Sequence, residues 1–192
     1  MNQRICVMLM LFLSVPALAL AHSGAGVSSG FISGFSHPLT GFDHLLAMLA
    51  VGLWAGGLGG RSIWAVPATF IVVMAAGALL GMSGMAFPYV EQGILLSVLV
   101  LGFLIAAALK LSLVYSSSLI GFFALFHGHA HGSEIPVATG AATYIIGFLA
   151  ATVLLHSTGL SLGLFMKNIC SGKIGRLVGC AIMLCGVYLT VS

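Results

Sequence analysis

Long apolar runs, separated by short polar or glycine-containing segments, dominate the chain from about residue 40 onward. A bilayer core about 30 Å thick needs about 20 apolar residues in an α-helix. Residues 22–36 are rich in glycine and serine and are too short to span, so we expect a loop or a short interfacial helix there. The pattern predicts an all-α, polytopic transmembrane helical bundle. Its six spans are expected at residues 40–59, 63–85, 92–110, 112–131, 136–157 and 174–191.

The N-terminal segment has the pattern of a secretory signal peptide. Arg4 precedes an apolar stretch at residues 5–15, and Ala19-Leu20-Ala21 forms a small-x-small cleavage site. We expect cleavage after Ala21, which makes residues 1–21 the signal peptide and 22–192 a single six-helix transmembrane domain. The alternative is an uncleaved first transmembrane helix.

The basic residues predict the orientation of the spans. Lys and Arg are enriched in cytoplasmic loops, and here they fall only in connections that follow an odd-numbered predicted span. Glu91 and Glu134 fall in the opposite set of connections. The mature N-terminus is therefore expected outside the cytoplasm. The basic residues concerned are Arg61, Lys110, Lys167, Lys173 and Arg176.

Composition strengthens the membrane interpretation. Of the 192 residues, 60% are hydrophobic and only 5% are charged, whereas about a quarter of the residues in a soluble domain are charged. The net charge of +3 is explained by topology signals and does not indicate nucleic-acid binding. The four cysteines show no CxxC or zinc-like spacing, and we expect Cys180 and Cys185 to be buried thiols within the last helix.

Two clusters of ionisable residues stand at the predicted outer ends of spans. HPLTGFDHLLAMLA, residues 37–50, contains His37, Asp43 and His44 at the start of the first span. FHGHAHGSE, residues 126–134, contains a second group of histidines at the end of the fourth span. Ionisable residues in a membrane are costly and usually mark a site or a pathway. The histidines of the second group are His127, His129 and His131.

Imidazole and carboxylate ligands favour divalent ions such as nickel, cobalt, zinc or copper(II). His37 and His44 share a helix face if the first span is continuous, with Pro38 in its first turn. Gly128 and Gly132 argue against a regular helix at the second cluster, so an irregular segment is expected there. In an extended segment His129 could join its neighbours.

Three further residues are candidates for secondary or path positions. His22 would combine an α-amine with an imidazole if cleavage follows Ala21. Met48 lies one turn beyond His44, and His156 lies within the fifth predicted span. For Met48 the alternative is ordinary packing, and for His156 it is a hydrogen bond between helices.

With these motifs assembled, the sequence resembles the HupE/UreJ family of hydrogenase and urease accessory membrane proteins. HPLTGFDHLLAMLAVGLWA and FHGHAHGSE carry the resemblance, and the signal peptide and six spans extend it over nearly the whole chain. The family is regarded as secondary nickel permeases, with cobalt possible for some members. The resemblance implies six functional positions: His37, Asp43, His44, His127, His131 and Glu134.

The resemblance implies a permease of the bacterial inner membrane, with no enzyme activity, no permanently bound cofactor and a divalent metal ion as its cargo. The chain contains no Walker motif, so no ATP hydrolysis and no ATPase subunit are evident. Two other classes are open alternatives. GMSG, residues 81–84, matches the short motif of intramembrane serine proteases, with Ser83 as nucleophile and His131 or His156 as base. A haem-binding electron carrier with two axial histidines is the other alternative.

Overall fold

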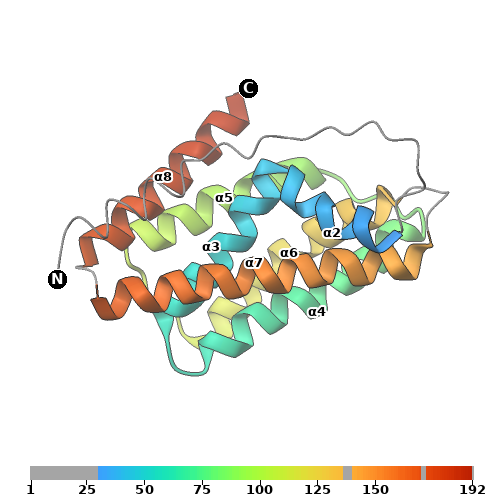
Figure 1. Ribbon diagram of the computed structural model, residues 1–192. Helices are drawn as coiled ribbons and strands as arrows, with labels where there is room; N and C mark the ends of the chain where they lie inside the picture. The colour runs from blue at the N-terminus through green and yellow to red at the C-terminus, as the bar shows by residue number, and fades with distance from the viewer. Residues whose placement is uncertain (1–29, 136–139, 170–171, 192) are drawn as a thin grey trace.

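The computed structural model describes residues 30–135, 140–169 and 172–191, and these residues form α-helices without any strand (Figure 1). The protein is thus all-α, as predicted. Each of the six predicted spans overlaps one helix from α3 to α8, with ends that differ by up to twelve residues. The helices are α2 (Gly30–Thr40), α3 (Phe42–Leu58), α4 (Ser62–Met82), α5 (Val90–Ala106), α6 (Leu113–Ser133), α7 (Ala141–Ile169) and α8 (Gly172–Val191).

Three of the described helices, α4, α7 and α8, are long and apolar enough to cross a membrane. A fourth candidate arises if α2 and α3 are counted as one bent span. Helix α5 is apolar but has only 17 residues, and α6 carries three histidines and four serines. The protein is therefore a helical membrane protein, while the predicted number of six spans is not confirmed by length and composition.

The first predicted span is broken near its start. Helices α2 and α3 meet at an angle of 82°, because Gly41 between them adopts an extended backbone with φ −81° and ψ 112°. Pro38 lies near the end of α2, and the expectation that it starts the span was wrong. A Cβ at Gly41 would lie 3.1 Å from Asp43 Oδ1 and 3.2 Å from His44 Nδ1. Glycine at the bend therefore leaves space for these two side chains.

Close helix pairs form where glycines face a neighbouring backbone. Helix α4 packs along α6, α3 and α2 pack along α7, and α5 packs along α8. A Cβ at Gly128 would overlap the carbonyl of Met74, and one at Gly132 would overlap that of Ala78. The expectation that these two glycines make the segment irregular was wrong, because α6 continues to Ser133. The glycines instead allow α4 to approach, as small residues do in membrane helices.

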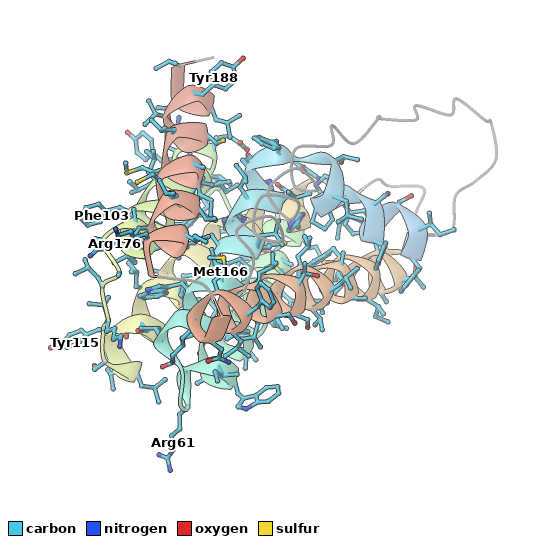
Figure 2. All side chains as sticks on the ribbon, turned by 60° about the vertical axis from the view of Figure 1, so that its left-hand side comes forward. Arg61, Phe103, Tyr115, Met166, Arg176 and Tyr188 are labelled. Atoms are coloured by element: carbon cyan, nitrogen blue, oxygen red, sulfur yellow. The ribbon has the colours of Figure 1, made fainter. Side chains whose placement is uncertain are left out.

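Large apolar side chains cover much of the outer surface (Figure 2). Phe103, Tyr115 and Tyr188, which the figure labels, are all exposed. Such a surface suits lipid rather than water, in agreement with a membrane protein. The prediction for the thiol of Cys180 was wrong, because it is exposed on this surface.

Acidic and basic side chains occupy opposite ends of the bundle. Asp43, Glu91 and Glu134 lie at the start of α3, the start of α5 and the end of α6. In Figure 1, α6 ends on the right near the start of α7, whereas α3 and α5 begin near the top centre. The opposite end holds five basic residues, at or beside the connections α3–α4, α5–α6 and α7–α8. They are Arg61, Lys110, Lys167, Lys173 and Arg176.

Candidate metal centre

Four imidazole rings form a row at the acidic end of the bundle. The ring centres of His37 and His131 are 5.0 Å apart, those of His131 and His44 are 4.8 Å apart, and those of His44 and His127 are 5.0 Å apart. We call these four side chains the histidine row. His37 comes from α2, His44 from the first turn of α3, and His127 and His131 from one face of α6. The two sequence clusters therefore meet in space.

Asp43 holds His44 in one orientation. Asp43 Oδ1 accepts a hydrogen bond from the His44 backbone N–H at 2.8 Å and lies 2.9 Å from His44 Nδ1. An ionised carboxylate only accepts hydrogen bonds, so Nδ1 carries the proton and Nε2 keeps its lone pair. His44 Nε2 is buried and has no hydrogen-bond partner in the part of the chain that the structure describes. This arrangement of carboxylate and histidine is typical of metal-binding imidazoles, in which one nitrogen is oriented and the other is free.

Ser97 on α5 orients His127 in the same way. Its hydroxyl donates to the carbonyl of Ile94 at 2.6 Å and lies 3.0 Å from His127 Nε2. Because a hydroxyl has one proton, Ser97 must accept from His127 Nε2–H. His127 Nδ1 then keeps its lone pair, and it is buried without a partner among the described side chains and backbone.

His131 occupies the middle of the row and is fully buried. Its ring stacks on Phe148 at 4.9 Å, and within residues 30–135, 140–169 and 172–191 neither ring nitrogen has a hydrogen-bond partner. Leaving a buried polar group unpaired costs about 1–3 kcal/mol, which indicates a function for these nitrogens.

The outer end of the row is partly exposed. His37 Nε2 lies 2.9 Å from Glu134 Oε2, and the Glu134 side chain is about half exposed, at 48%. The ring of Tyr144 lies 6.0 Å from that of His37 and borders this end. Glu134 and His37 are therefore the members of this group that are most open to the surroundings.

The spacing of the row can be compared with that of imidazoles on one ion. An ion about 2.0–2.1 Å from a ring nitrogen lies roughly 3.2 Å from the ring centre, so two neighbouring ligands have centres roughly 4.5–5 Å apart. Adjacent rings of the row have this separation. Within the described residues, however, no three His, Cys, Asp or Glu side chains are arranged to hold a metal ion together. The row is thus a series of ring pairs rather than a closed cage.

A fifth histidine lies deeper in the bundle. His156 on α7 is buried, and neither of its ring nitrogens is paired with a described residue. The ring of Phe70 separates it from the row, with its centre 5.0 Å from His156 and 5.4 Å from His127. Nearby on the same helix, Thr152 Oγ1 lies 3.4 Å from Met48 Sδ, and both residues are fully buried.

Other candidates lie away from the row. His129 Nε2 is 2.8 Å from the carbonyl of Met85, and its ring packs on Phe87, so it faces the connection between α4 and α5. His22 lies outside the described residues, as does the predicted cleavage site. The Ser83 hydroxyl donates to the carbonyl of Leu80 at 2.7 Å, and among the described residues no histidine is hydrogen-bonded to it.

The sequence reasoning missed Ser97 and Phe70. Ser97 could have been noticed as an isolated polar residue within an apolar helix. Phe70 carries no such signal, because its position between two histidines follows only from the packing of α4 on α6 and α7.

Comparison with known proteins adds independent information. Residues 9–189 match the family model described as HupE / UreJ protein. The chain is 44% identical over 180 residues to Protein HupE of Rhizobium leguminosarum bv. viciae, and the alignment covers 94% of each protein. No solved structure gives a significant match.

Proposed function

Because this chain belongs to the HupE/UreJ family, we propose that it is a permease that imports Ni²⁺, or Co²⁺, for the maturation of a metalloenzyme. Family membership supports an accessory role in nickel or cobalt transport for hydrogenase or urease. The permease activity, the ligands and the direction of transport are our proposal.

The observation that carries the proposal is the set of unpaired nitrogens along the histidine row. Asp43 and Ser97 each occupy one nitrogen of their histidine and leave the other free. Neutral imidazole nitrogens are suitable ligands for nickel and cobalt, whereas no cysteine lies near the row among the described residues.

We propose that the ion moves along the row by exchanging ligands. Glu134 attracts the hydrated ion, and His37 with His131 forms the first pair of ligands. The pairs His131–His44 and His44–His127 follow, and His156 lies beyond Phe70. Transport requires binding that is strong enough for the ion to enter and weak enough for it to leave. Ligand pairs meet this requirement better than a four-ligand cage.

The proposed orientation places the acidic end in the periplasm and the basic end in the cytoplasm, according to the positive-inside rule. It includes cleavage of the signal peptide, six spans and the bacterial inner membrane. Two positive charges that move inward gain about 4.6 kcal/mol per 100 mV of membrane potential. The potential alone is thus sufficient to drive uptake without ATP.

The two alternative functions find less support. Ser83 has no histidine base bound to it among the described residues, and a serine nucleophile needs one within hydrogen-bond reach. Two axial histidines on one haem iron would have ring centres about 6.4 Å apart on opposite sides of the porphyrin, by the same bond lengths. Adjacent rings in the row are closer than this. The centres of His37 and His44 are 6.4 Å apart, but the ring of His131 lies within 5.0 Å of both and occupies the space that a porphyrin would need.

Uptake of radioactive nickel by cells that lack their own nickel importers tests the proposal. We expect uptake by the wild type, and its loss in His44→Ala and His131→Ala. His129→Ala is the matched control from the same sequence motif, because His129 faces away from the row, and it should retain uptake. Membrane expression is measured for each variant.

Two outcomes would contradict the proposal. Normal uptake by expressed His131→Ala would show that the ion does not pass along the histidine row. Absence of both nickel and cobalt uptake by the wild type would show that the protein is not a permease for these ions. Equal loss in all three variants would reject the distinction between the row and His129.

A further inference from the structure

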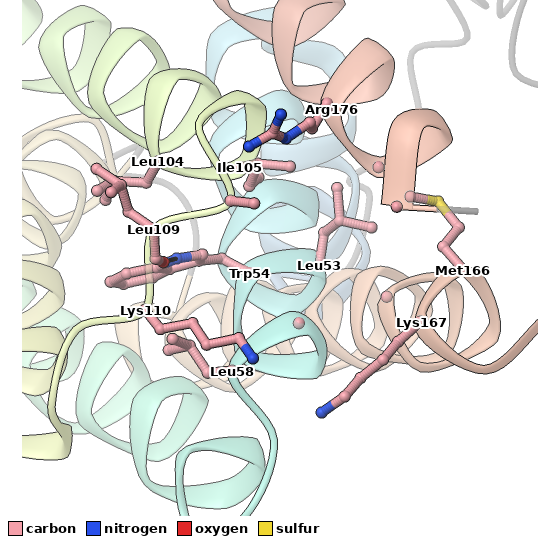
Figure 3. A pocket seen from close by; sticks show the side chains of 15 residues that line it. Leu53, Trp54, Leu58, Leu104, Ile105, Leu109, Lys110, Met166, Lys167 and Arg176 are labelled. Carbon is pink, nitrogen blue, oxygen red and sulfur yellow. Dashed lines mark hydrogen bonds between the residues drawn. The ribbon is translucent and has the colours of Figure 1, made fainter. Parts of the chain in front are cut away.

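A second site lies at the basic end of the bundle, beyond the proposed transport site. A pocket of about 140 Å³ opens there between α3, α5, α7 and α8 (Figure 3). Its walls are apolar and include Leu53, Leu104, Ile105 and Met166. Trp54 forms part of the lining and is held in place because its indole N–H donates to the carbonyl of Leu109 at 3.2 Å. The side chain of Trp54 is buried.

Three cationic side chains line this pocket: Lys110, Lys167 and Arg176. Figure 3 shows Arg176 on one side of Trp54 and the two lysines on the other. Arg176 donates one hydrogen bond, at 3.3 Å, to the carbonyl of Ala107, so among the described residues most of its guanidinium donors have no acceptor. Three positive charges from separate elements therefore converge on one apolar pocket.

The protein supplies no carboxylate side chain to neutralise these charges. The chain has three acidic residues, and Asp43 and Glu134 are paired with histidines at the opposite end. Glu91 lies in the first turn of α5, whereas the pocket is formed by the last turn of that helix. An anion that neutralises the pocket must come from outside the protein.

The position of the pocket restricts the class of that anion. It lies at the ends of membrane helices, where lipid headgroups are the immediate neighbours, and its walls suit an acyl chain. Basic pockets between membrane helices on the cytoplasmic side are known to bind anionic lipid headgroups. A free phosphate ion would use the cations but would leave the apolar walls unfilled.

We propose that this pocket binds an anionic phospholipid. Its phosphate contacts Lys110 and Lys167, while Arg176, on the other side of Trp54, adds to the positive potential of the pocket. The upper part of an acyl chain packs against Trp54, Leu53 and Met166. The lipid fills the space between α3, α5, α7 and α8 at the basic end of the bundle.

Quenching of Trp54 fluorescence by brominated lipid measures binding in the pocket. The chain has two tryptophans, and Trp64 is 75% exposed on the outer surface, so Trp64→Phe leaves Trp54 as the only tryptophan. This protein is reconstituted in phosphatidylcholine bilayers with increasing mole fractions of phosphatidylglycerol that is brominated near the headgroup end of its chains. Brominated phosphatidylcholine at equal mole fraction is the lipid control. We expect phosphatidylglycerol to quench Trp54 at a lower mole fraction than phosphatidylcholine.

Substitutions of the lysines that line the pocket test whether the preference for phosphatidylglycerol arises there. Lys110→Gln or Lys167→Gln should raise the mole fraction for half-maximal quenching roughly fivefold, the typical contribution of one basic residue near a lipid surface. Lys110→Arg keeps the charge and should keep the preference. Arg61→Gln and Lys173→Gln are matched controls, because these cations lie at the same end of the bundle but do not line the pocket.

Several results would overturn the proposal. Equal quenching by the two brominated lipids would show that the pocket does not select anionic lipid. Equal effects of Arg61→Gln and Lys110→Gln would indicate general surface charge. Displacement of the brominated lipid by inorganic phosphate would identify a free-anion site, and displacement by polyglutamate at equal ionic strength would identify a site for an acidic protein segment. If the protein selects anionic lipid but transports no nickel, the proposed permease function is contradicted and the lipid site is not.

Discussion

At the scale of single residues, the histidine row depends on partners that are not themselves ligands. Asp43 and Ser97 each hold a proton on one ring nitrogen and thereby decide which nitrogen is free. His131 has no such partner and stacks on Phe148 instead. The rings of the row therefore differ in how strongly their orientation is defined.

Ser97→Ala tests this dependence. The variant removes the acceptor of His127 Nε2–H, which leaves a buried donor unpaired at a cost of about 1–3 kcal/mol. Loss of a partner that orients a ligand typically lowers metal affinity about 10- to 100-fold, so nickel uptake should fall to a similar extent. The measurement is the initial uptake rate as a function of nickel concentration.

A matched variant separates orientation from general damage. Thr152→Val removes a buried hydroxyl that, among the described residues, is bonded to Met48 Sδ and to the carbonyl of Phe148 and not to a row histidine. Its uptake should exceed that of Ser97→Ala at equal expression. If Ser97→Ala transports as well as the wild type, Ser97 does not orient a ligand.

At the scale of secondary structure elements, the site depends on close packing between helices. Gly128 and Gly132 lie on the same helix as His127 and His131 and contact the backbone of α4. The extended backbone of Gly41 turns α2 across the end of α3, which brings His37 to the row. Small residues thus place the histidines even though they provide no ligand.

Gly128→Ala should therefore destabilise the protein, because its Cβ would overlap the carbonyl of Met74 and force α4 and α6 apart. The expected cost is about 1–3 kcal/mol, as for overpacking in a core, with a corresponding fall in the thermal unfolding temperature in detergent. Nickel uptake should also fall, since His127 and His131 move with α6.

Gly57→Ala is the control for this prediction. Gly57 is also a helical glycine, but a Cβ there would have no heavy atom within 4 Å. Alanine stabilises a helix by about 0.5–1 kcal/mol relative to glycine, so the unfolding temperature should stay equal or rise. A greater loss of stability in Gly57→Ala than in Gly128→Ala would contradict the packing argument.

At the scale of the whole molecule, charge is divided between the two ends. The acidic residues and the histidine row lie at one end, and all five basic residues of the predicted connections lie at the other. This separation attracts cations to one end and anions to the other. It also places the two proposed sites at opposite ends of the bundle.

Uptake should depend on pH as expected for histidine ligands. A metal binds the neutral imidazole, and the free side chain has a pKa of about 6.5, so protons compete increasingly as the pH falls through about 6. Uptake at a subsaturating nickel concentration should thus decrease from neutral to acid pH, with the membrane potential held constant by a potassium gradient and valinomycin. An increase in uptake below about pH 6 would contradict histidine ligation.

The sequence by itself determined the all-helical membrane character, the approximate place of each helix from α3 to α8, and the presence of both histidine clusters at one end. The helices follow from hydropathy, which is summed over each segment by itself. The common end of the clusters follows because consecutive spans alternate in direction across the membrane. The spacings of Gly52 with Gly56 and of Gly77 with Gly81 permit close helix approach, but the structure alone shows that α3 meets α7 and α4 meets α6 there.

Only the tertiary structure decided which side chains meet. A regular α6 directs His127 and His131 toward His44 but directs His129 toward Met85, because residues four apart share a helix face and those two apart do not. The roles of Ser97 and Phe70, and the convergence of three cations on one pocket, depend on contacts between residues far apart in sequence. Such contacts arise from the shapes of packed helices, which the hydropathy pattern does not contain.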